Sequence, residues 1–261
     1  MKFLPSPSAA ASAPSLPAGF RRGFAGSAHA ARWRPGLVAE CRHGEIFAQS
    51  GEASGAGLAL ALALDAMRSA APDPAADTPD ERAWLWVQDK AALRLSGRPY
   101  RPGLPAALRH RLVHVAAMTP EDALFGLEEG LRCRDFAFVI GEIAGNPRAL
   151  DFTASRRLSL AAERHGVPLW LVRLDARRDL GSARMRWEAR AAPSPPPRWN
   201  PQSPGTPSWA AGLFRAHTHQ PGQWILRDDG LALLAEPASA PATPDHGDLV
   251  RAAGDRSLAA G

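Results

Sequence analysis

The residues between 45 and 64 have the form of a phosphate-binding loop whose chemical groups have been lost. Such a loop needs Gly, four residues and then Gly-Lys-Ser/Thr, because the lysine holds phosphates and the hydroxyl holds Mg²⁺. The window from Ser50 to Gly57 keeps the second glycine, but the lysine and hydroxyl positions hold Ala and Gly, and Glu52 brings the wrong charge. We therefore predict a vestigial loop and no cofactor. The vestigial loop consists of Ser50, Gly51, Gly55, Ala56 and Gly57.

Two further elements of an ATPase are also missing. Hydrolysis needs a glutamate after the second strand and an aspartate at the end of the strand that positions the Mg²⁺ water shell. After the strand predicted at 83–87 the chain reads Gln-Asp-Lys-Ala-Ala-Leu, which contains no glutamate. The strand predicted at 136–140 ends in Gly141 instead of aspartate, and Glu142 follows one residue late, on another face by strand alternation. Because the phosphate-loop lysine, the glutamate and the aspartate are all missing, we predict that the protein is not an enzyme. We regard Gly141 and Glu142 as a vestigial acidic site.

The elements that surround the vestigial loop alternate between strand and helix, which predicts an α/β fold with a mainly parallel sheet flanked by helices. The helix after the loop is apolar nearly all round, as a helix buried against a sheet would be. Thr119 begins a second helix, and Asp151 or Thr153 begins a third that ends at Gly166. Apolar runs typical of buried strands lie at 45–48, 83–87, 112–116, 136–140 and 169–173.

The pattern changes after residue 183. Residues 184–190 alternate strictly between charged and apolar side chains, which predicts a half-exposed antiparallel strand. A Pro-rich loop at 193–207 follows, and residues 213–218 and 223–226 are expected to form a hairpin. We therefore predict that residues 183–236 are the antiparallel part of a single domain.

Composition sets the outer limits of that domain. Of the 261 residues, 1–35 are rich in Ala, Ser and Pro and are predicted to be disordered, 36–236 form the single α/β domain, and 237–261 form a second disordered tail. Lys2 and Lys90 are the only lysines, and the net charge of +5 permits an anionic partner. No apolar run approaches the roughly 20 residues that span a bilayer, so no membrane partner is predicted. The N-terminal arginines resemble a transit peptide, but prolines interrupt any amphipathic helix there.

The cysteines and histidines do not predict a metal site. Cys41 and Cys133 lie far apart and in no CxxC motif, which favours a reducing cytosol. Cys41 with His43, and His217 with His219, each lie on one face of a strand, but neither pair has the spacing of a zinc motif. We predict that no metal is bound.

Motifs spread over residues 35–236 resemble the ImuA family, RecA-like accessory proteins of bacterial SOS mutagenesis. The most specific stretch is LDFTASRRLSLAAERHGVPLWLVR at 150–173, supported by PPRW at 196–199 and PGQWIL at 221–226. The chain departs from the family in a weaker basic segment at 215–220 and a short segment at 176–183.

The resemblance implies a RecA-like core and a role in translesion synthesis after DNA damage. It implies two partners, which are an ImuB-like Y-family polymerase homologue without catalytic activity and an error-prone replicative-type DNA polymerase. It also implies a link to RecA itself, and it places the chain in the cytoplasm, at the nucleoid when DNA is damaged.

Several arginines are candidate contacts for DNA or for a partner protein. Two of them lie in the first turn of the predicted third helix, where positive charge opposes the helix dipole; the alternative is a pair of exposed arginines near an acidic residue. Three more share one face of the strand at 184–190 and, with Arg215 and Arg227, predict a basic stripe, whose alternative is the solvated face of an antiparallel sheet. The candidate contacts are Arg156, Arg157, Arg184, Arg186, Arg190 and Arg215.

Two classes of function follow from these patterns. The leading hypothesis is a non-catalytic RecA-like adaptor that joins the two polymerases during SOS translesion synthesis. The alternative is a DNA-binding or RecA-filament-regulating module, and a residual ATPase ranks third. Because disordered segments can fold onto partners, the C-terminal hairpin and tail are the predicted partner surface.

Overall fold

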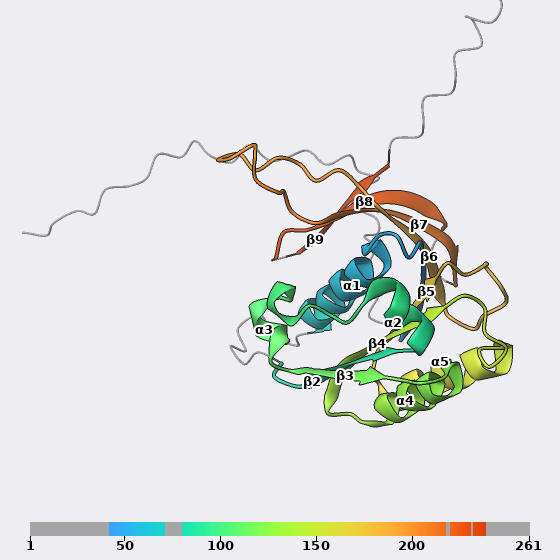
Figure 1. The fold of residues 1–261 in the computed structure, drawn as a ribbon. Helices are drawn as coiled ribbons and strands as arrows, with labels where there is room; N and C mark the ends of the chain where they lie inside the picture. Colours follow the sequence, from blue (N-terminus) through green and yellow to red (C-terminus); the bar gives the residue numbers. More distant parts are fainter. Residues whose placement is uncertain (1–41, 71–79, 218–219, 231, 239–261) are drawn as a thin grey trace, which may run out of the picture. The chain divides into compact units, whose positions relative to one another are not determined.

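The computed structural model describes residues 42–70, 80–217, 220–230 and 232–238, and these contain one nine-stranded sheet of order β3-β2-β4-β5-β1-β6-β7-β8-β9 (Figure 1). The strands are β1 (His43–Ala48), β2 (Ala83–Gln88), β3 (Leu112–Ala116), β4 (Phe136–Ala144), β5 (Leu169–Leu174), β6 (Met185–Ala191), β7 (Ser208–Ala216), β8 (Gly222–Asp228) and β9 (Leu233–Pro237). The helices are α1 (Ser54–Ala70), α2 (Lys90–Ser96), α3 (Ala106–Arg109), α4 (Pro120–Arg132) and α5 (Phe152–His165), with a 3-10 turn η1 (Arg101–Gly103).

The pairing of the strands confirms the predicted fold class. All pairs among β1 to β5 are parallel, and β6 joins this part through a parallel pairing with β1. The pairs β6–β7, β7–β8 and β8–β9 are antiparallel, as predicted for the C-terminal part. The chain is therefore an α/β protein with a mostly parallel core and an antiparallel extension.

Helices cover both faces of the parallel part. On one face, α1, α2 and α3 bury their apolar side chains against a core that includes Ile46 and Trp86. On the other face lie α4 and α5 (Figure 1). These two helices pack Leu127 and Leu158 against Val139 and its neighbours. Strands that are covered on both faces must be apolar throughout, which is why they appear in the sequence as continuous apolar runs.

Local signals fix the ends of the two helices on the second face. The side chain of Thr119 accepts a hydrogen bond from the amide of Asp122, whose carboxylate accepts in return from the amide of Thr119. This reciprocal capping box confirms the predicted start of α4. Asp151, rather than Thr153, caps α5 by accepting from the amide of Ala154 at 2.7 Å. The helix ends at Gly166, whose φ of 74° is the left-handed conformation that glycine adopts readily.

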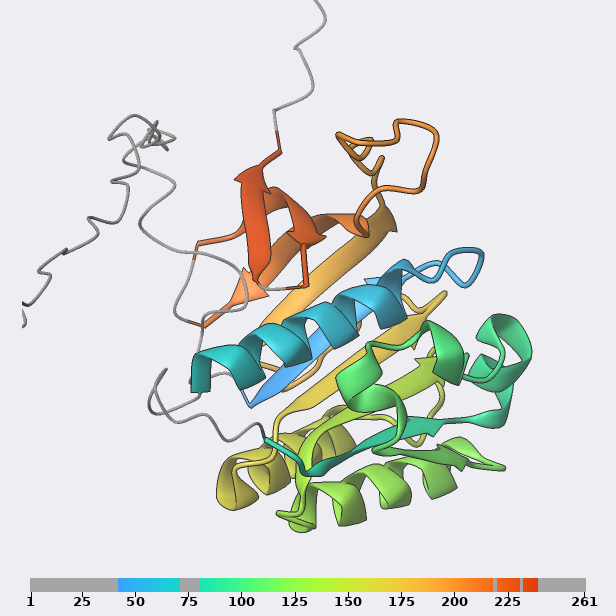
Figure 2. The same cartoon turned by 90° about the vertical axis from the view of Figure 1, so that its left-hand side faces the viewer.

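The antiparallel strands curl over α1 (Figure 2). The amide of Leu233 in β9 donates to the carboxylate of Asp65 in α1 at 3.3 Å. Arg68, one turn later on α1, forms an ion pair with Asp228 of β8 at 3.5 Å. This helix is enclosed between the parallel strands and the C-terminal extension, which explains why its sequence is apolar nearly all round.

The structure also corrects several details. Strand β4 continues to Ala144 and does not end at Gly141. Strand β6 is not simply an antiparallel strand, because its other neighbour, β1, is parallel. Helix α2 and strand β9 were not predicted, and Pro237, the first residue of the predicted C-terminal tail, is the last residue of β9. Of the tails predicted at 1–35 and 237–261, residues 1–35 and 239–261 lie outside the described residues. No helix in the described part is long and apolar enough to cross a bilayer.

Candidate functional site: a vestigial loop and an arginine pocket

The vestigial loop connects the carboxyl end of β1 to the start of α1, where the sequence predicted it. At Gly55 an added Cβ atom would lie 2.7 Å from Cβ of Ala48 and 2.8 Å from Cγ1 of Val172. Real Cβ atoms do not approach other atoms so closely, so glycine is needed here for α1 to pack against β1 and β5. The glycine that survives from the motif thus has a purely structural reason to be there.

Two carboxylates of the protein itself lie at the vestigial loop, and one of them binds donors of the loop. Asp175, directly after β5, accepts from the amide of Ser50 at 2.9 Å and from its hydroxyl at 2.5 Å. These hydrogen bonds lower the pKa of the Asp175 carboxyl, which is therefore ionised at neutral pH. Asp175 has a φ of 51°, in the left-handed region that only a few residue types adopt easily. On the other side of the loop, the carboxylate of Glu52 accepts from the amide of Ala191 in β6. Two acidic groups therefore lie where a nucleotide would need positive charge.

The positions of the missing lysine and hydroxyl are packed against the protein core. Ala56 contacts the cluster of buried side chains around α1. A Cβ atom on Gly57 would lie 2.9 Å from Nε1 of Trp209, so β7 leaves no room for a larger residue there. The chemistry of a phosphate loop is absent from both positions, and at Gly57 the space for it is absent as well.

The vestigial acidic site is sealed inside the protein. A Cβ atom on Gly141 would lie 2.9 Å from side-chain atoms of Leu127 and Leu171, on the α4 side of the sheet. Glu142 faces the opposite side, as alternation predicted, and its carboxylate accepts from Nε2 of Gln88 at 2.6 Å and from Nε1 of Trp86 at 3.2 Å. Its side chain is 1% exposed, and burial raises the pKa of the Glu142 carboxyl. A carboxyl group enclosed in this way cannot hold a water shell around Mg²⁺.

The predicted basic stripe along β6 is wrong, because Arg186 is buried. Its side chain is 3% exposed, and Nε donates to the carboxylate of Glu45 at 2.6 Å. Arg173 donates to the other oxygen of the same carboxylate at 2.8 Å. Alternation identified the correct face of β6, but this strand lies inside the sheet, and its neighbour β1 places Glu45 directly opposite Arg186. The charge is compensated inside the protein and is unavailable to a ligand.

Two more of the predicted arginines have acidic partners and do not join the others. Arg190, at the exposed end of β6, donates to Glu188 at 2.8 Å. Arg157 forms an ion pair with Glu128 of α4 at 3.4 Å. Because Asp151 caps α5, Arg156 and Arg157 lie in its second turn and not in its first, so the argument from the helix dipole does not apply to them.

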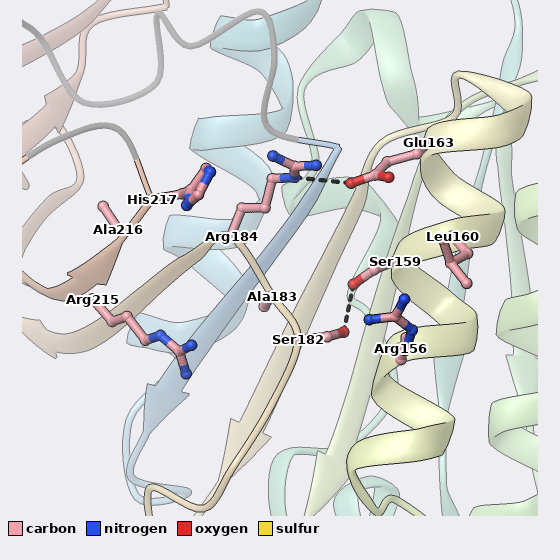
Figure 3. A pocket seen from close by; sticks show the side chains of 10 residues that line it. All are labelled: Arg156, Ser159, Leu160, Glu163, Ser182, Ala183, Arg184, Arg215, Ala216 and His217. Atoms are coloured by element: carbon pink, nitrogen blue, oxygen red, sulfur yellow. Dashed lines mark hydrogen bonds and ion pairs between the residues drawn. The ribbon is translucent and has the colours of Figure 1, made fainter.

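The remaining three predicted arginines meet around one open pocket of about 530 Å³, which we call the arginine pocket (Figure 3). Arg156 comes from α5, Arg184 lies directly before β6, and Arg215 lies on β7. Glu163 of α5 also lines the pocket, and its carboxylate accepts from Nε of Arg184 at 2.8 Å. His217 lies at the rim beside Arg184, whose carbonyl oxygen accepts from the His217 amide. Three elements that are distant in the sequence thus bring their positive charges together.

Buried hydroxyl groups fix the floor of the arginine pocket. Ser159 and Ser182 lie with their oxygens 2.6 Å apart, and the amide of Ser182 donates to the hydroxyl of Ser155 at 2.9 Å. Nδ1 of His43 lies 2.7 Å from the hydroxyl of Ser159. Burial and, secondly, the charge of Arg186 lower the pKa of His43 to about 3, so this imidazole is neutral at neutral pH. Sequence reasoning missed this network, and the signal available was the i, i+4 spacing of Ser155 and Ser159 on the inner face of α5.

Within the described residues, no group of three His, Cys, Asp or Glu side chains could hold a metal ion. His43 lies beneath the arginine pocket. Cys41, which was paired with His43 in the sequence, and His219, which was paired with His217, both lie outside the described residues. The arginine pocket is thus a concave, positively charged site among the described residues, and it lies at the opposite end of β6 from the vestigial loop.

The chain is 35% identical over 155 residues to Protein ImuA of Caulobacter vibrioides, both in strain NA1000 / CB15N and in strain ATCC 19089 / CIP 103742 / CB 15. The match covers 56% of this chain and 60% of each relative, which is less than two thirds of the relatives' length. No protein-family model matches the chain. The comparison agrees with the resemblance that the motifs predicted: over these 155 residues the chain is similar to Protein ImuA.

Proposed function

We propose that this chain is a non-catalytic adaptor in DNA-damage-induced (SOS) translesion synthesis. It joins an ImuB-like Y-family polymerase homologue to an error-prone replicative-type polymerase, in the cytoplasm and at the nucleoid. The similarity to Protein ImuA supports the SOS role. The observation that carries the non-catalytic part is the contact between Asp175 and Ser50, in which a carboxylate takes the hydrogen bonds that a phosphate loop offers to its nucleotide.

The contact favours an adaptor over an ATPase for an electrostatic reason. A phosphate loop binds its ligand through backbone donors, a lysine and a helix N-terminus, all of which attract negative charge. Here the carboxylate of Asp175 occupies the donors of Ser50, Glu52 adds a second acidic side chain to the loop, and Lys90, the only lysine in the described part, begins a different helix, α2. Any nucleotide phosphate would have to displace the carboxylate of Asp175, which is already hydrogen-bonded. The RecA-like core then serves as a surface for partners, and no cofactor is required.

The direct test of the non-catalytic part measures nucleotide binding and turnover on the full chain. We expect titration calorimetry with Mg-ATP to give no binding heat and phosphate release to stay at background. Glu142→Gln serves as the control, since it removes the carboxyl of the vestigial acidic site and keeps the shape of the side chain. ATP hydrolysis by the wild type that disappears in Glu142→Gln would overturn this part of the proposal.

The partner assignment is tested by co-expression with the polymerase homologue encoded in the same genome. We expect the tagged full chain to retain that protein through size-exclusion chromatography and to retain the error-prone polymerase when all three are present. The same experiment on a chain ending at Ala238 keeps β9 complete and asks whether residues 239–261 are needed. Failure of the full chain to retain either polymerase would contradict the adaptor role. The link to RecA stays a prediction.

A further inference from the structure

We propose that the arginine pocket binds a phosphate group in the backbone of a DNA strand. This inference goes beyond the adaptor role, since a chain can join two polymerases without contacting DNA. It assigns to Arg156, Arg184 and Arg215 a direct contact with the nucleic acid on which the polymerases act. The pocket adjoins the start of β6, whereas the vestigial loop contacts Ala189 and Ala191 at the end of the same strand. The proposed DNA contact is therefore not the nucleotide site of an ATPase.

The three arginines are available to a ligand because their contacts inside the protein are few and weak. Within the described residues, Arg156 has no hydrogen bond or ion pair, and Arg215 donates to the carbonyl of Gly181 at a long 3.4 Å. Arg184 is paired with Glu163, but both side chains are more than one third exposed. An ion pair at such a surface contributes about 0–1 kcal/mol, so a phosphate can compete for this guanidinium.

The floor of the pocket adds fixed hydroxyl groups to these charges. Ser182 is held against α5 by the hydroxyls of Ser155 and Ser159, and Ser159 is held in turn by the neutral ring of His43. Because these groups are ordered before any ligand arrives, little conformational entropy is lost when an oxyanion approaches them. Serine hydroxyls and arginines are both among the side chains that contact DNA phosphates.

The remaining lining favours a phosphate over an acidic peptide or a base. A peptide site needs a buried apolar anchor, but Leu160 is the only large aliphatic side chain in the lining and is 51% exposed. A base needs an aromatic platform, and no Phe, Tyr or Trp lines the described pocket. The planar fork of arginine matches the oxygens of a phosphate, and three arginines against one glutamate leave a net positive charge. The contact is therefore to the backbone and independent of sequence.

The test measures the affinity of the full chain for fluorescein-labelled oligothymidine, and for a duplex of the same length, by fluorescence anisotropy across a range of salt concentrations. In the double variant Arg156→Ala/Arg215→Ala we expect affinity to fall about tenfold for each arginine at low salt. We also expect the slope of log affinity against log salt for the single strand to fall by about 0.7 per arginine. Glu163→Gln should tighten binding about two- to fivefold, because it frees Arg184 and removes the opposing charge.

The matched control is Arg157→Ala, which removes the neighbouring arginine on the same helix but outside the pocket. It should leave both the affinity and the salt slope near those of the wild type. All the substituted side chains are exposed, and thermal unfolding verifies that each variant is folded. Comparing the two DNA probes shows whether the pocket prefers single strands, and inorganic phosphate at constant ionic strength shows whether a free anion displaces them.

Three results would overturn the inference. The first is a wild type that binds neither DNA probe, and the second is an Arg157→Ala variant as weak as the pocket variants. The third is a pocket variant that keeps its DNA affinity but no longer retains the polymerase homologue, which would make the pocket a protein interface. Since retention of the polymerases is measured separately, loss of DNA binding alone would leave the adaptor proposal intact.

Discussion

Strand β6 lies between two sites of opposite character. At its end, the carboxylate of Asp175 accepts from the amide of Ser50 in the vestigial loop, and Glu52 of the same loop accepts from the amide of Ala191 in β6. At its start, the arginine pocket holds three guanidinium groups whose contacts within the described residues are few: an exposed ion pair of Arg184 with Glu163 and a long hydrogen bond from Arg215 to Gly181. The seven residues of β6 place its two ends about 20 Å apart, at a rise of roughly 3.3 Å per residue. One strand thus connects a site that the protein has filled with its own side chains to a site that it leaves open.

The comparison of the two sites shows that charge alone does not identify a binding site. Arg186 carries the same charge as Arg184, two residues away, but Glu45 compensates it inside the sheet. Asp175 is well exposed, but both oxygens of its carboxylate accept hydrogen bonds from Ser50. What distinguishes a site is whether its polar groups lack partners where solvent can reach them. By this criterion the arginine pocket is the better candidate for a binding site, and the vestigial loop is the poorer one.

The largest expected effect separates Arg186 from Arg184. Arg186→Ala should lower the free energy of unfolding by about 3–5 kcal/mol, because it breaks a buried charge pair and leaves a cavity beside Phe47 and Phe214. Arg184→Ala should lower it by less than about 1 kcal/mol, because its ion pair is exposed. Urea unfolding of both variants measures the difference. Equal losses would mean that the two arginines have the same structural role and that the contrast between them is false.

The next effect concerns an attempt to restore the phosphate loop. In Ala56→Lys/Gly57→Thr, the new Cβ at position 57 must push against Trp209, which should cost about 1–3 kcal/mol of stability. Mg-ATP should still give no binding heat, because Glu52 remains in the loop and Asp175 remains hydrogen-bonded to Ser50. Gly126→Ala is the matched control in α4, where a Cβ meets its nearest neighbour at 3.7 Å and should stabilise the helix slightly. ATP binding by the double variant would show that the two carboxylates do not block the loop.

A pH effect tests the floor of the arginine pocket. Because the pKa of His43 falls from 6.5 to about 3 on folding, only the unfolded chain binds a proton between these values. Stability should therefore decline as the pH falls below about 6.5, by up to about 1.4 kcal/mol per pH unit from this residue. His43→Gln should show a shallower decline, whereas substitution of the exposed His110 should change nothing. Parallel declines in wild type and His43→Gln would contradict the assignment.

The smallest effect concerns the contact that closes the vestigial loop. Asp175→Ala should lose about 1–2 kcal/mol, because Ser50 loses its acceptor and alanine is strained at a positive φ. Asp175→Asn should lose less, because asparagine tolerates this conformation and keeps one acceptor oxygen. The contribution of the ionised carboxyl is present above its ordinary pKa and disappears as the pH falls through the lowered value. Thermal unfolding at neutral and acidic pH measures both variants, and equal losses for Ala and Asn would exclude conformational strain.

Much of the fold was predictable because its signals are local. The strand at 112–116 has the predicted limits, and Thr119 and Gly166 mark helix ends as expected, because caps and apolar runs act over a few residues. Helix α2 was missed since Asp89 caps it and only seven residues follow, which is too short for a clear apolar period. Strand β9 was missed because it follows the curl of the sheet over α1, a long-range contact.

The candidate sites depend on long-range contacts even more than the fold does, and were therefore harder to predict from the sequence. Residue types and spacing alone show that the phosphate loop lacks its lysine and hydroxyl. They also show several arginines within, or C-terminal to, the stretch at 150–173 that resembles the ImuA family. Three contacts became visible only in the folded chain. Asp175 binds the vestigial loop, and Glu45 compensates the charge of Arg186. Helix α5, the residue before β6 and strand β7 bring three arginines around one pocket. The physical reason is that residue types and spacings record local chemistry, whereas charge compensation depends on which groups the sheet order and strand register bring within a few ångströms.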